Sequence, residues 1–508
     1  MDYDPPTPVE SRLAKKRLVR WLVIAALALL GVYYLVFVNQ YVIAYENDVD
    51  HFKHGSIGSE VANGVPTLVL RALPVMYKNE LGPGGYRKFG LLYETPNAEL
   101  PIGFSRRVVQ GVERAWLNCA VCHVGTYRLA AADPPKYLYG APANNLRLQE
   151  FSKFLLGVGA DPGFTADSLI AAINSPEVGG RLNFVEEAIY RHIVYPRVRD
   201  ALQELGKKLS FLNRQNDWGP GRVDTFNPYK AIQFGQSLDE RHITNEELNG
   251  SSDYPSIWRQ RPREGLFLHW DGNNSSVDER NLSAALGAGV TPVTVDRKSI
   301  ARVKQWTWDL TPPEFPDRSA INLAAVERGQ VLYAEYCASC HGMRDKGSQQ
   351  YSYDRHRFPA LGEVTRLDDI ATDRGRWASY TTDFSGSQNL LYAGYPWRFS
   401  HFRKTGGYAN QPLDGIWARS PYLHNGSVPT LRDLLEPAKN RPTVWYRGSD
   451  LFDVKKVGYR SDAEAGAELF RYDTSLSGNS NAGHEGAYYG TELLPSDKDA
   501  LVEYMKTL

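Results

Sequence analysis

The most apolar stretch of the chain is residues 21–45, which contain no charged side chain. As an α-helix with a rise of about 1.5 Å per residue, it would be longer than the roughly 30 Å core of a bilayer. Charged residues flank it, basic before and acidic after: Lys15, Lys16, Arg17, Arg20, Glu46, Asp48 and Asp50. Because basic flanks stay in the cytoplasm, the pattern predicts a transmembrane anchor over 21–45 and a cytoplasmic tail over 1–20. A buried core helix and a cleaved signal peptide are the alternatives.

Apolar residues at helical spacing recur in two later parts of the chain. Residues 142–215 are predicted to be helical, and their first helix would bury one face: Leu146, Leu148, Phe151, Phe154, Leu155 and Val158. Ser496 is expected to begin the last helix, with Asp499 in a capping-box position. The packing face of that helix would be Leu501, Val502, Met505 and Leu508. Residues 46–115 and 216–300 are rich in glycine, proline and polar residues, which predicts mostly loops.

Composition narrows the class of protein. Of the 508 residues, 42% are hydrophobic and 23% are charged, values that exclude wholesale disorder. Lysine plus arginine and aspartate plus glutamate both total 58, so the net charge is zero and no nucleic-acid partner is expected. The chain has only four cysteines, and every one of them belongs to a C-x-x-C-H motif.

These two motifs are the strongest chemical signal in the sequence. They consist of Cys119, Cys122 and His123, and of Cys337, Cys340 and His341. Two thiols at this spacing can bond to the two vinyl groups of one haem while the histidine binds its iron. A zinc site and a redox-active cysteine pair are the alternatives. The motifs predict two covalently bound haem c groups, attached outside the cytoplasm, and hence a body in the bacterial periplasm behind a single-pass inner-membrane anchor.

The second axial ligand of each iron is not given by the motifs. The four methionines, Met1, Met76, Met343 and Met505, are not expected to ligate, because none of them has a suitable context. Histidine or an open position is expected instead. Three histidines stand out: His484 lies in the loop before the last helix, His424 in SPYLHNGSVPTL, and His269 beside Trp270.

Several segments together carry a family resemblance. They are HFKHGSIGSE (51–60), ELPIGFS (99–105), GLFLHWDGNNSSVDERN (265–281), ARSPYLHNGSVPTLRDLL (418–435) and GNSNAGHEG (478–486) with the last helix. In this order, around two haem motifs, they resemble the bacterial di-haem cytochrome c peroxidase superfamily. That superfamily includes the maturation enzyme of methylamine dehydrogenase and the rubber oxygenases. The first two segments are similar to the rubber-oxygenase-like branch.

The resemblance implies roles for several residues. His484 matches the distal ligand of the second haem, which would then be held by His341 and His484. His424 matches a histidine that lies near that haem without ligating it. Trp270 matches the tryptophan that conducts electrons between the haems. In an extended stretch, adjacent side chains point opposite ways, so His269 is not expected to ligate if Trp270 faces the haem gap.

The resemblance also implies a calcium ion between the two haem domains. The family's asparagine ligand matches Asp253, and its backbone carbonyl ligands match Arg419 and Pro421. Carboxylate oxygen is a hard ligand that suits calcium. A solvated aspartate in a turn is the alternative.

The first haem site departs from the peroxidase pattern. Peroxidases carry a glutamine at the position of Arg280 and a glutamate at that of Val290. Cleavage of peroxide needs a group that moves a proton between its oxygens, which valine cannot do and arginine, always protonated, cannot do either. No histidine follows His123 until His192. The far side of this haem is therefore expected to be open or apolar, near Ala285, as in an oxygen-binding site.

These observations predict a mainly α fold with two cytochrome c-like haem domains, long loops and one N-terminal transmembrane helix. Residues 46–310 would form the first haem domain and residues 311–508 the second, with the proline-rich segment 311–317 between them. The first haem would react with or bind a small oxidant, and the second would relay electrons from or to a protein partner. A peroxidase and a non-catalytic electron-transfer cytochrome are the competing functions.

Overall fold

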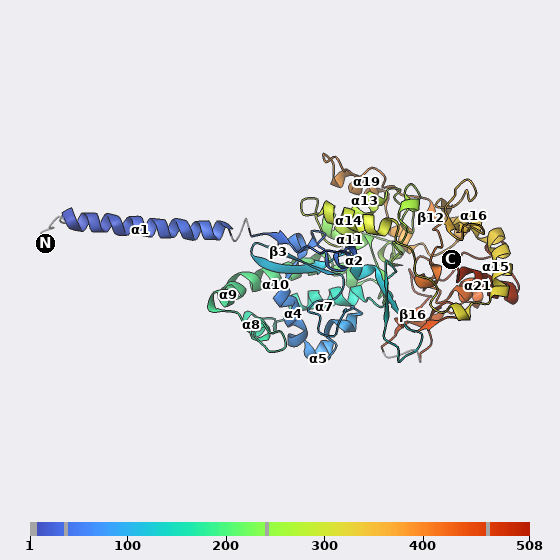
Figure 1. The fold of residues 1–508 in the computed structure, drawn as a ribbon, viewed down its shortest axis with the longest axis horizontal. Helices are drawn as coiled ribbons and strands as arrows, with labels where there is room; N and C mark the ends of the chain where they lie inside the picture. The colour runs from blue at the N-terminus through green and yellow to red at the C-terminus, as the bar shows by residue number, and fades with distance from the viewer. Residues whose placement is uncertain (1–7, 35–38, 239–242, 464–467) are drawn as a thin grey trace.

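Helices and short antiparallel strand pairs both build the fold (Figure 1). The computed structural model describes residues 8–34, 39–238, 243–463 and 468–508. The protein is 44% helical and 12% strand, so the expected mainly helical fold is wrong. Buried backbone groups need hydrogen-bond partners, and the glycine-rich connecting segments find them by pairing as short ladders.

The longer helices of the body are α4 (Thr67–Met76), α7 (Leu148–Ala160), α8 (Ala166–Ile173), α10 (Tyr195–Lys208), α11 (Phe226–Phe234), α13 (Val277–Gly287), α14 (Arg297–Trp308), α15 (Leu323–Tyr336), α19 (Thr382–Leu391) and α21 (Pro495–Met505). Two-stranded antiparallel ladders join β5 (Val124–Tyr127) to β6 (Lys136–Tyr139), β7 (Arg222–Val223) to β8 (Ser252–Asp253), β9 (Met343–Arg344) to β10 (Tyr351–Ser352), β11 (Val364–Arg366) to β12 (Gly407–Ala409), β13 (Val444–Arg447) to β16 (Phe470–Asp473), and β14 (Phe452–Asp453) to β15 (Gly458–Tyr459).

A four-stranded antiparallel sheet is built largely from the region, residues 46–115, that was expected to consist mostly of loops. Its order is β1–β3–β4–β2, from β1 (Tyr41–Val42), β2 (Val65–Pro66), β3 (Phe104–Val109) and β4 (Val112–Leu117). Gln110 and Gly111 connect β3 to β4, and both have positive φ, 53° and 75°. A two-residue turn of this kind matches the twist of a hairpin, which explains why the chain reverses here.

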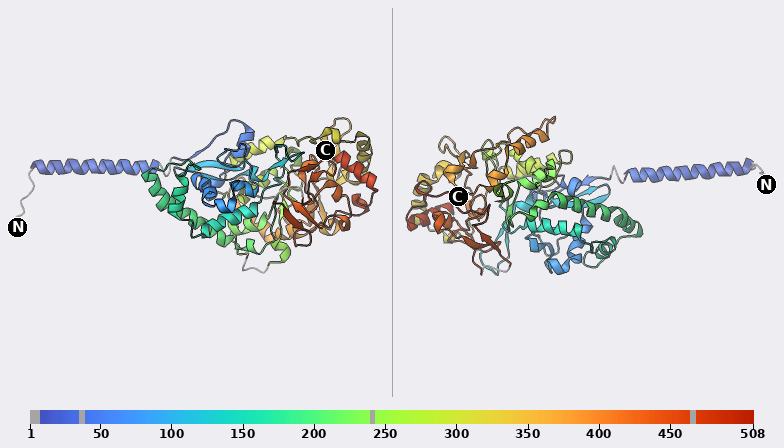
Figure 2. Two further views of the ribbon diagram at one scale, coloured as in Figure 1. Left: turned by 90° about the horizontal axis from the view of Figure 1, so that it is seen from below. Right: turned by 180° about the vertical axis from the view of Figure 1, so that it is seen from behind.

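The helices predicted in residues 142–215 are present. α7, α8 and α10 pack with α4 beside the four-stranded sheet, at the end of the body from which α1 projects (Figures 1 and 2). The predicted inner face of α7 is buried at Phe151, Phe154, Leu155 and Val158. These side chains join α4 in one hydrophobic core.

At the opposite end of the body, α15 crosses α21 at very close range. A Cβ atom on Gly329 of α15 would lie 1.9 Å from the carbonyl oxygen of Ala500, so only glycine fits at the crossing. The predicted packing face of the last helix is confirmed, since Leu501, Val502, Met505 and Leu508 are all buried. The predicted cap is wrong: α21 begins at Pro495, and no side chain caps it.

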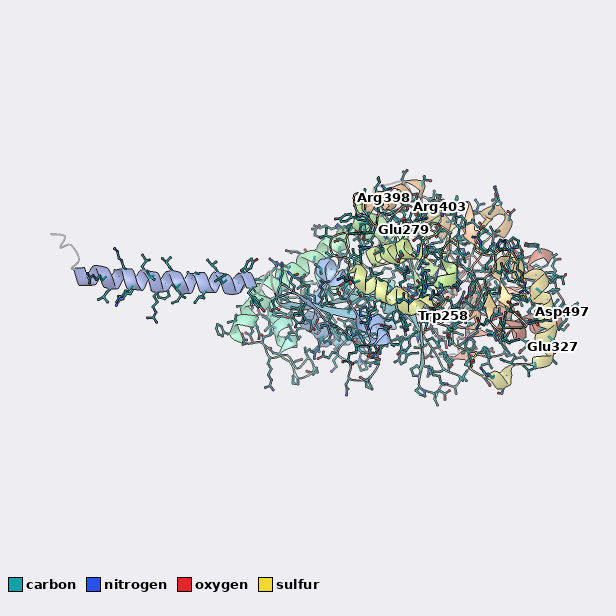
Figure 3. The ribbon with its side chains drawn as sticks, turned by 45° about the horizontal axis from the view of Figure 1, so that its top comes forward. Trp258, Glu279, Glu327, Arg398, Arg403 and Asp497 are labelled. Carbon is teal, nitrogen blue, oxygen red and sulfur yellow. The ribbon has the colours of Figure 1, made fainter. Side chains whose placement is uncertain are left out.

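Trp258 packs in the core beneath α15 and α21, although it belongs to the first of the two expected domains. It is completely buried, and Figure 3 places it towards the middle of the body. Its indole N–H donates to the carbonyl of Tyr139 at 3.0 Å, and the guanidinium of Arg419 lies 5.6 Å from its ring centre. The two parts of the chain therefore share this core.

The N-terminal helix differs from the expected anchor. α1 (Pro8–Tyr33) includes the basic residues before the apolar stretch and ends at Tyr33, while Tyr41 and Val42 pair with β3. Among the residues that the structure describes, no helix combines the length and the apolar character needed to cross a membrane. The predicted transmembrane helix and the inner-membrane location inferred from it are therefore wrong. Residues 1–7 of the expected tail and 35–38 of the expected anchor lie outside the described residues.

Candidate haem sites

The first C-x-x-C-H motif is held by a buried asparagine. Cys119 and Cys122 lie in the short helix α6 (Cys119–Cys122), and the side chain of Asn118 accepts a hydrogen bond from the backbone N–H of Ala120 at 3.0 Å. The amide group of Asn118 also donates to the carbonyls of Phe52 and Gly55, at 3.2 and 3.0 Å. Asn118 thus ties the motif to the end of α2 (Asp48–His54).

His123 is oriented and kept neutral by its surroundings. Its Nδ1 donates to the backbone carbonyl of Pro255 at 3.0 Å, which leaves Nε2 for a metal. Burial, together with the nearby positive charge of Arg280, lowers the pKa of His123 to about 4. A neutral imidazole with one nitrogen already hydrogen-bonded is the form that binds iron.

The second motif has the same arrangement. His341 ends α16 (Ala338–His341), and its Nδ1 donates to the carbonyl of Gln411 at 2.7 Å. Gly342 follows with φ of 71°, and a Cβ there would lie 2.6 Å from the carbonyl oxygen of Ser352. Glycine is therefore required for the chain to leave the motif next to β10.

The surroundings of the four thiols favour covalent attachment of haem over the alternatives that the sequence left open. None of them forms a disulfide. Burial raises the pKa of Cys119 to about 11 and those of Cys122 and Cys337 to about 12, whereas a redox-active pair needs a thiolate near neutral pH. Within the described parts of the chain, no three histidine, cysteine or acidic side chains form a cluster that could hold a metal ion, as a zinc site would require. The thiols remain suited to covalent attachment of haem.

His484 faces His341. Their ring centres are 6.2 Å apart, with 43° between the ring planes. Two metal–nitrogen bonds of about 2 Å each, plus the half-widths of two imidazoles, span this distance. Burial and the neighbouring charges of His341 and Arg441 lower the pKa of His484 to about 3, so this ring is neutral as well. The two residues would hold one haem iron between them.

The loop that presents His484 has a strained but well-supported backbone. His484 has φ of 49°, and its N–H donates to the carbonyl of Ile370 at 2.8 Å. The preceding Gly483 also has positive φ, 79°, and a Cβ on it would lie 2.4 Å from backbone atoms of Ile370 and Ala371. Left-handed backbone at a histidine costs free energy, which the surrounding contacts offset.

A buried arginine, which the sequence analysis did not single out, supports the same loop. Arg441 donates to the carbonyl oxygens of Asn481, Gly483 and His484, at 2.6, 2.8 and 3.2 Å. It is only 2% exposed. No local sequence signal marks Arg441, because its partners lie about forty residues further along the chain.

His424 does not face His341 in this way. Its ring stacks on Tyr408 with the centres 4.1 Å apart and 19° between the planes. The side chain is buried, and its Nε2 has no hydrogen-bond partner among the described residues. Burial and the charges of Arg376 and Arg222 lower the pKa of His424 to about 3. The backbone carbonyl of His424 accepts from the N–H of Asp253 at 2.9 Å, so its own chain segment braces Asp253.

Trp270 lies in a hydrogen-bonded connection between the two motif histidines. Its indole N–H donates to the carbonyl of Asp253 at 2.8 Å, two residues before Pro255, which accepts from His123. On the other side, the side chain of Gln411 donates to the carbonyl of His269 at 3.2 Å, while the carbonyl of Gln411 accepts from His341. A path of backbone and hydrogen bonds thus runs from one haem ligand to the other past Trp270.

A pocket opens in the same place. Pro255, Gln411, Trp270, His269 and Arg280 all contribute to its lining. The expectation that His269 and Trp270 point opposite ways assumed extended backbone, but φ at His269 is +63°. Both residues consequently border one pocket, and Nδ1 of His269 contacts Oδ1 of Asn273 at 2.5 Å.

The residues expected to hold calcium also border this pocket but do not fit the ion. Asp253, Arg419 and Pro421 are all in its lining. The carboxylate of Asp253, however, already forms a buried ion pair with Arg447 at 2.7 Å. A guanidinium occupies the side of the carboxylate where a calcium ion would need oxygen ligands.

A buried hydrophobic cluster that includes part of α13 lies beside the first motif. Ala285 and Val290 are buried, 3% and 0% exposed, in a hydrophobic cluster with Leu282 and Leu286. Cys119 packs against this cluster. Among the described residues, the ring of His123 makes no ring contact with another imidazole, in contrast to His341.

Two protein-family models match the part of the chain that contains the second site. The model for cytochrome c matches residues 326–396, which include the motif at Cys337. A second model, described as RoxA-like, cytochrome c-like, matches residues 407–446. The protein thus contains a cytochrome c domain with covalently bound haem c. Together the two matches support a di-haem cytochrome c family.

Two relatives come from Sinorhizobium fredii, and both are uncharacterized proteins. The chain is 26% identical to y4iJ over 544 residues, which cover 87% of each protein. It is 30% identical to y4iM over 299 residues, which cover 50% of this chain and 64% of y4iM. The similarity to y4iJ therefore extends beyond the second haem site over most of the chain.

Proposed function

We propose that the protein is a di-haem c-type oxidoreductase with two unequal haem sites. One observation carries the proposal: His341 has a second imidazole 6.2 Å away, whereas His123 has none at such a spacing among the described residues. A haem held by His341 and His484 has no free position and suits electron relay. A haem held by Cys119, Cys122 and His123 keeps one face for a small oxidant.

The residues around the first site favour binding of a small, neutral molecule. Haem c supplies the one-electron and oxygen chemistry when it is bound. Ala285 and Val290 belong to the buried cluster that packs against Cys119 and would form an apolar wall of this site, and neither side chain can move a proton. Peroxide cleavage, which needs a positioned acid–base group, is therefore disfavoured relative to oxygen binding.

Trp270 is the proposed electron conduit between the sites. Its hydrogen bond to Asp253 fixes the indole in the connection between His123 and His341. Electrons would enter at the second haem from an electron-transfer protein and pass Trp270 to the first haem. The same connection would also serve a pure electron carrier, so ligand binding at the first haem separates the two functions.

Mass and ligand-binding measurements test the proposal. Denatured, mature protein is expected to have the mass of the chain plus two haems, and carbon monoxide is expected to bind one reduced haem per chain. Turnover of hydrogen peroxide with an artificial electron donor should be slow, because a missing acid–base group typically costs about 10²–10⁴-fold. Two six-coordinate haems that bind no carbon monoxide would make the protein an electron carrier, and rapid peroxide turnover would make it a peroxidase.

A further inference from the structure

A buried arginine connects the two parts of the chain beside Trp270. Arg447, at the end of β13, is 3% exposed, and its Nη2 lies 2.7 Å from the carboxylate of Asp253 in β8. Its Nη1 donates to the carbonyl of Gly426 at 3.1 Å, and its Nε donates to the carbonyl of Pro220. All three nitrogens of the guanidinium are thus bound by oxygens.

Two glycines leave the space that the guanidinium of Arg447 occupies. A Cβ on Gly426 would lie 2.3 Å from Nη1 of Arg447 and equally close to the carboxylate of Asp253. A Cβ on Gly221 would lie 2.8 Å from Nη2 of Arg447. Both glycines have positive φ, so backbone closes around the ion pair where any larger residue would collide with it.

The charges around Asp253 disfavour binding of a metal ion in addition to Arg447. Arg222, completely buried, is the other guanidinium near Asp253, and it is bound by neutral groups: the carbonyls of Ser251 and Gly478 and the side chain of Asn479. Asp253 is therefore within electrostatic range of two positive charges, one of which, Arg222, also interacts with the carboxylate of Asp373. A divalent ion placed at Asp253 would be repelled by both.

We propose that Arg447 is a built-in cation that takes the place of an interdomain metal ion and positions Trp270 through Asp253. The ion pair holds the Asp253 side chain, and the backbone carbonyl of the same residue accepts the indole N–H of Trp270. Arg447 is thus a positioning residue for the connection between the haem sites. The cation assignment itself is independent of which reaction the first haem performs.

The test compares calcium dependence in the haem-loaded protein and in Arg447→Ala. The unmodified protein, stripped with a calcium chelator, should keep its melting temperature, and added calcium should neither bind with one-to-one stoichiometry nor change that temperature. Arg447→Ala leaves a carboxylate and two carbonyl oxygens around a void, so its melting temperature should fall by several degrees. Calcium or methylguanidinium should restore part of that loss, since each returns a cation to the void.

Matched variants separate this role from simple loss of an arginine. Arg471→Ala, on the neighbouring strand β16, removes an exposed arginine that pairs with Asp473 and should change neither property. Arg447→Lys keeps the charge and should retain calcium independence even if Arg447→Ala fails to fold. Stoichiometric calcium binding by the unmodified protein, with destabilisation by the chelator, would overturn the proposal. An Arg447→Ala protein as stable as the unmodified one would overturn it as well. Because these readouts are binding and stability, they do not depend on carbon monoxide binding at the first haem.

Discussion

The imidazole rings of His341 and His484 lie 6.2 Å apart although the two residues are far apart in the chain. His341 is held from one side by the carbonyl of Gln411, and His484 from the other by the backbone of Ile370. The bond of His341 fixes its ring and that of His484 fixes its backbone, while Nδ1 of His484 is buried without a hydrogen-bond partner among the described residues. The spacing is therefore a property of the folded chain, and it is ready to receive one iron.

Replacement of His484 by alanine should change the spin state of one haem. His484→Ala removes the second axial ligand, so the haem held by His341 should convert from low spin to high spin, as measured by electron paramagnetic resonance and absorption spectra. His424→Ala is the matched control, because it removes another imidazole with a strongly lowered pKa, one that stacks on Tyr408 instead of facing His341. A high-spin signal from His424→Ala alone would reverse the assignment.

Arg441→Ala should loosen the ligand loop. The loss leaves the carbonyls of Asn481, Gly483 and His484 without their buried donor, which should lower the free energy of unfolding by about 1–3 kcal/mol. A high-spin fraction should also appear at the second haem. Arg460→Ala removes an exposed arginine paired with Asp462 and should do neither. If both variants retain the low-spin spectrum, Arg441 only contributes to stability.

Trp270→Phe should slow electron transfer between the haems. Phenylalanine keeps an aromatic ring but cannot donate to the carbonyl of Asp253, so the indole connection is broken. Flash photolysis of the carbon monoxide complex in the half-reduced protein would measure the rate, with a several-fold decrease expected. Trp308→Phe, on α14 and away from the connection, is the control. Equal rates in both variants would exclude Trp270 as the conduit.

The haem potentials should depend on the protonation of Asp253. Burial raises the pKa of Asp253 to about 6, and the charges of Arg447 and Arg222 act in the opposite direction. As the pH falls through about 6, the carboxylate takes up a proton and the uncompensated positive charge favours the reduced iron, so the potentials should rise. Redox titrations from pH 8 to pH 5 would measure this step. Asp253→Asn should abolish it, whereas a step that persists belongs to another group.

Gly329→Ala should destabilise the crossing of α15 and α21. The added methyl group would meet the carbonyl of Ala500 at 1.9 Å, and overpacking of this kind costs about 1–3 kcal/mol. Gly347→Ala places the same methyl group where no atom lies within 4 Å and should change stability by less than about 0.5 kcal/mol. Chemical denaturation of both variants would measure the difference, and equal stabilities would mean that the helices shift apart freely.

The sequence predicted correctly those features that depend only on residues close together in the chain. The spacing of Cys119, Cys122 and His123 is a property of consecutive residues, and the apolar faces of α7 and α21 follow from helical periodicity. The strands β3 and β4 were missed because each carries two adjacent charged residues, Arg106 and Arg107 in β3 and Glu113 and Arg114 in β4, which interrupt the alternation by which a strand is recognised. Hydropathy also predicted an end of the N-terminal helix that lies too far along the chain, at residue 45. Helix α1 ends at Tyr33, and the apolar residues Tyr41 and Val42 pair with β3, which hydropathy alone does not indicate.

The amino-acid sequence alone predicted attachment of haem c at the two C-x-x-C-H motifs, and it identified the packing face of the C-terminal helix. Only the tertiary structure decided which groups meet across long stretches of chain. Arg441 reaches the His484 loop, Arg447 reaches Asp253, and Gln411 reaches His341 through contacts that no local pattern encodes. The physical reason is that a buried guanidinium or imidazole must be satisfied by whatever oxygens the fold brings next to it, and their identity depends on the whole chain.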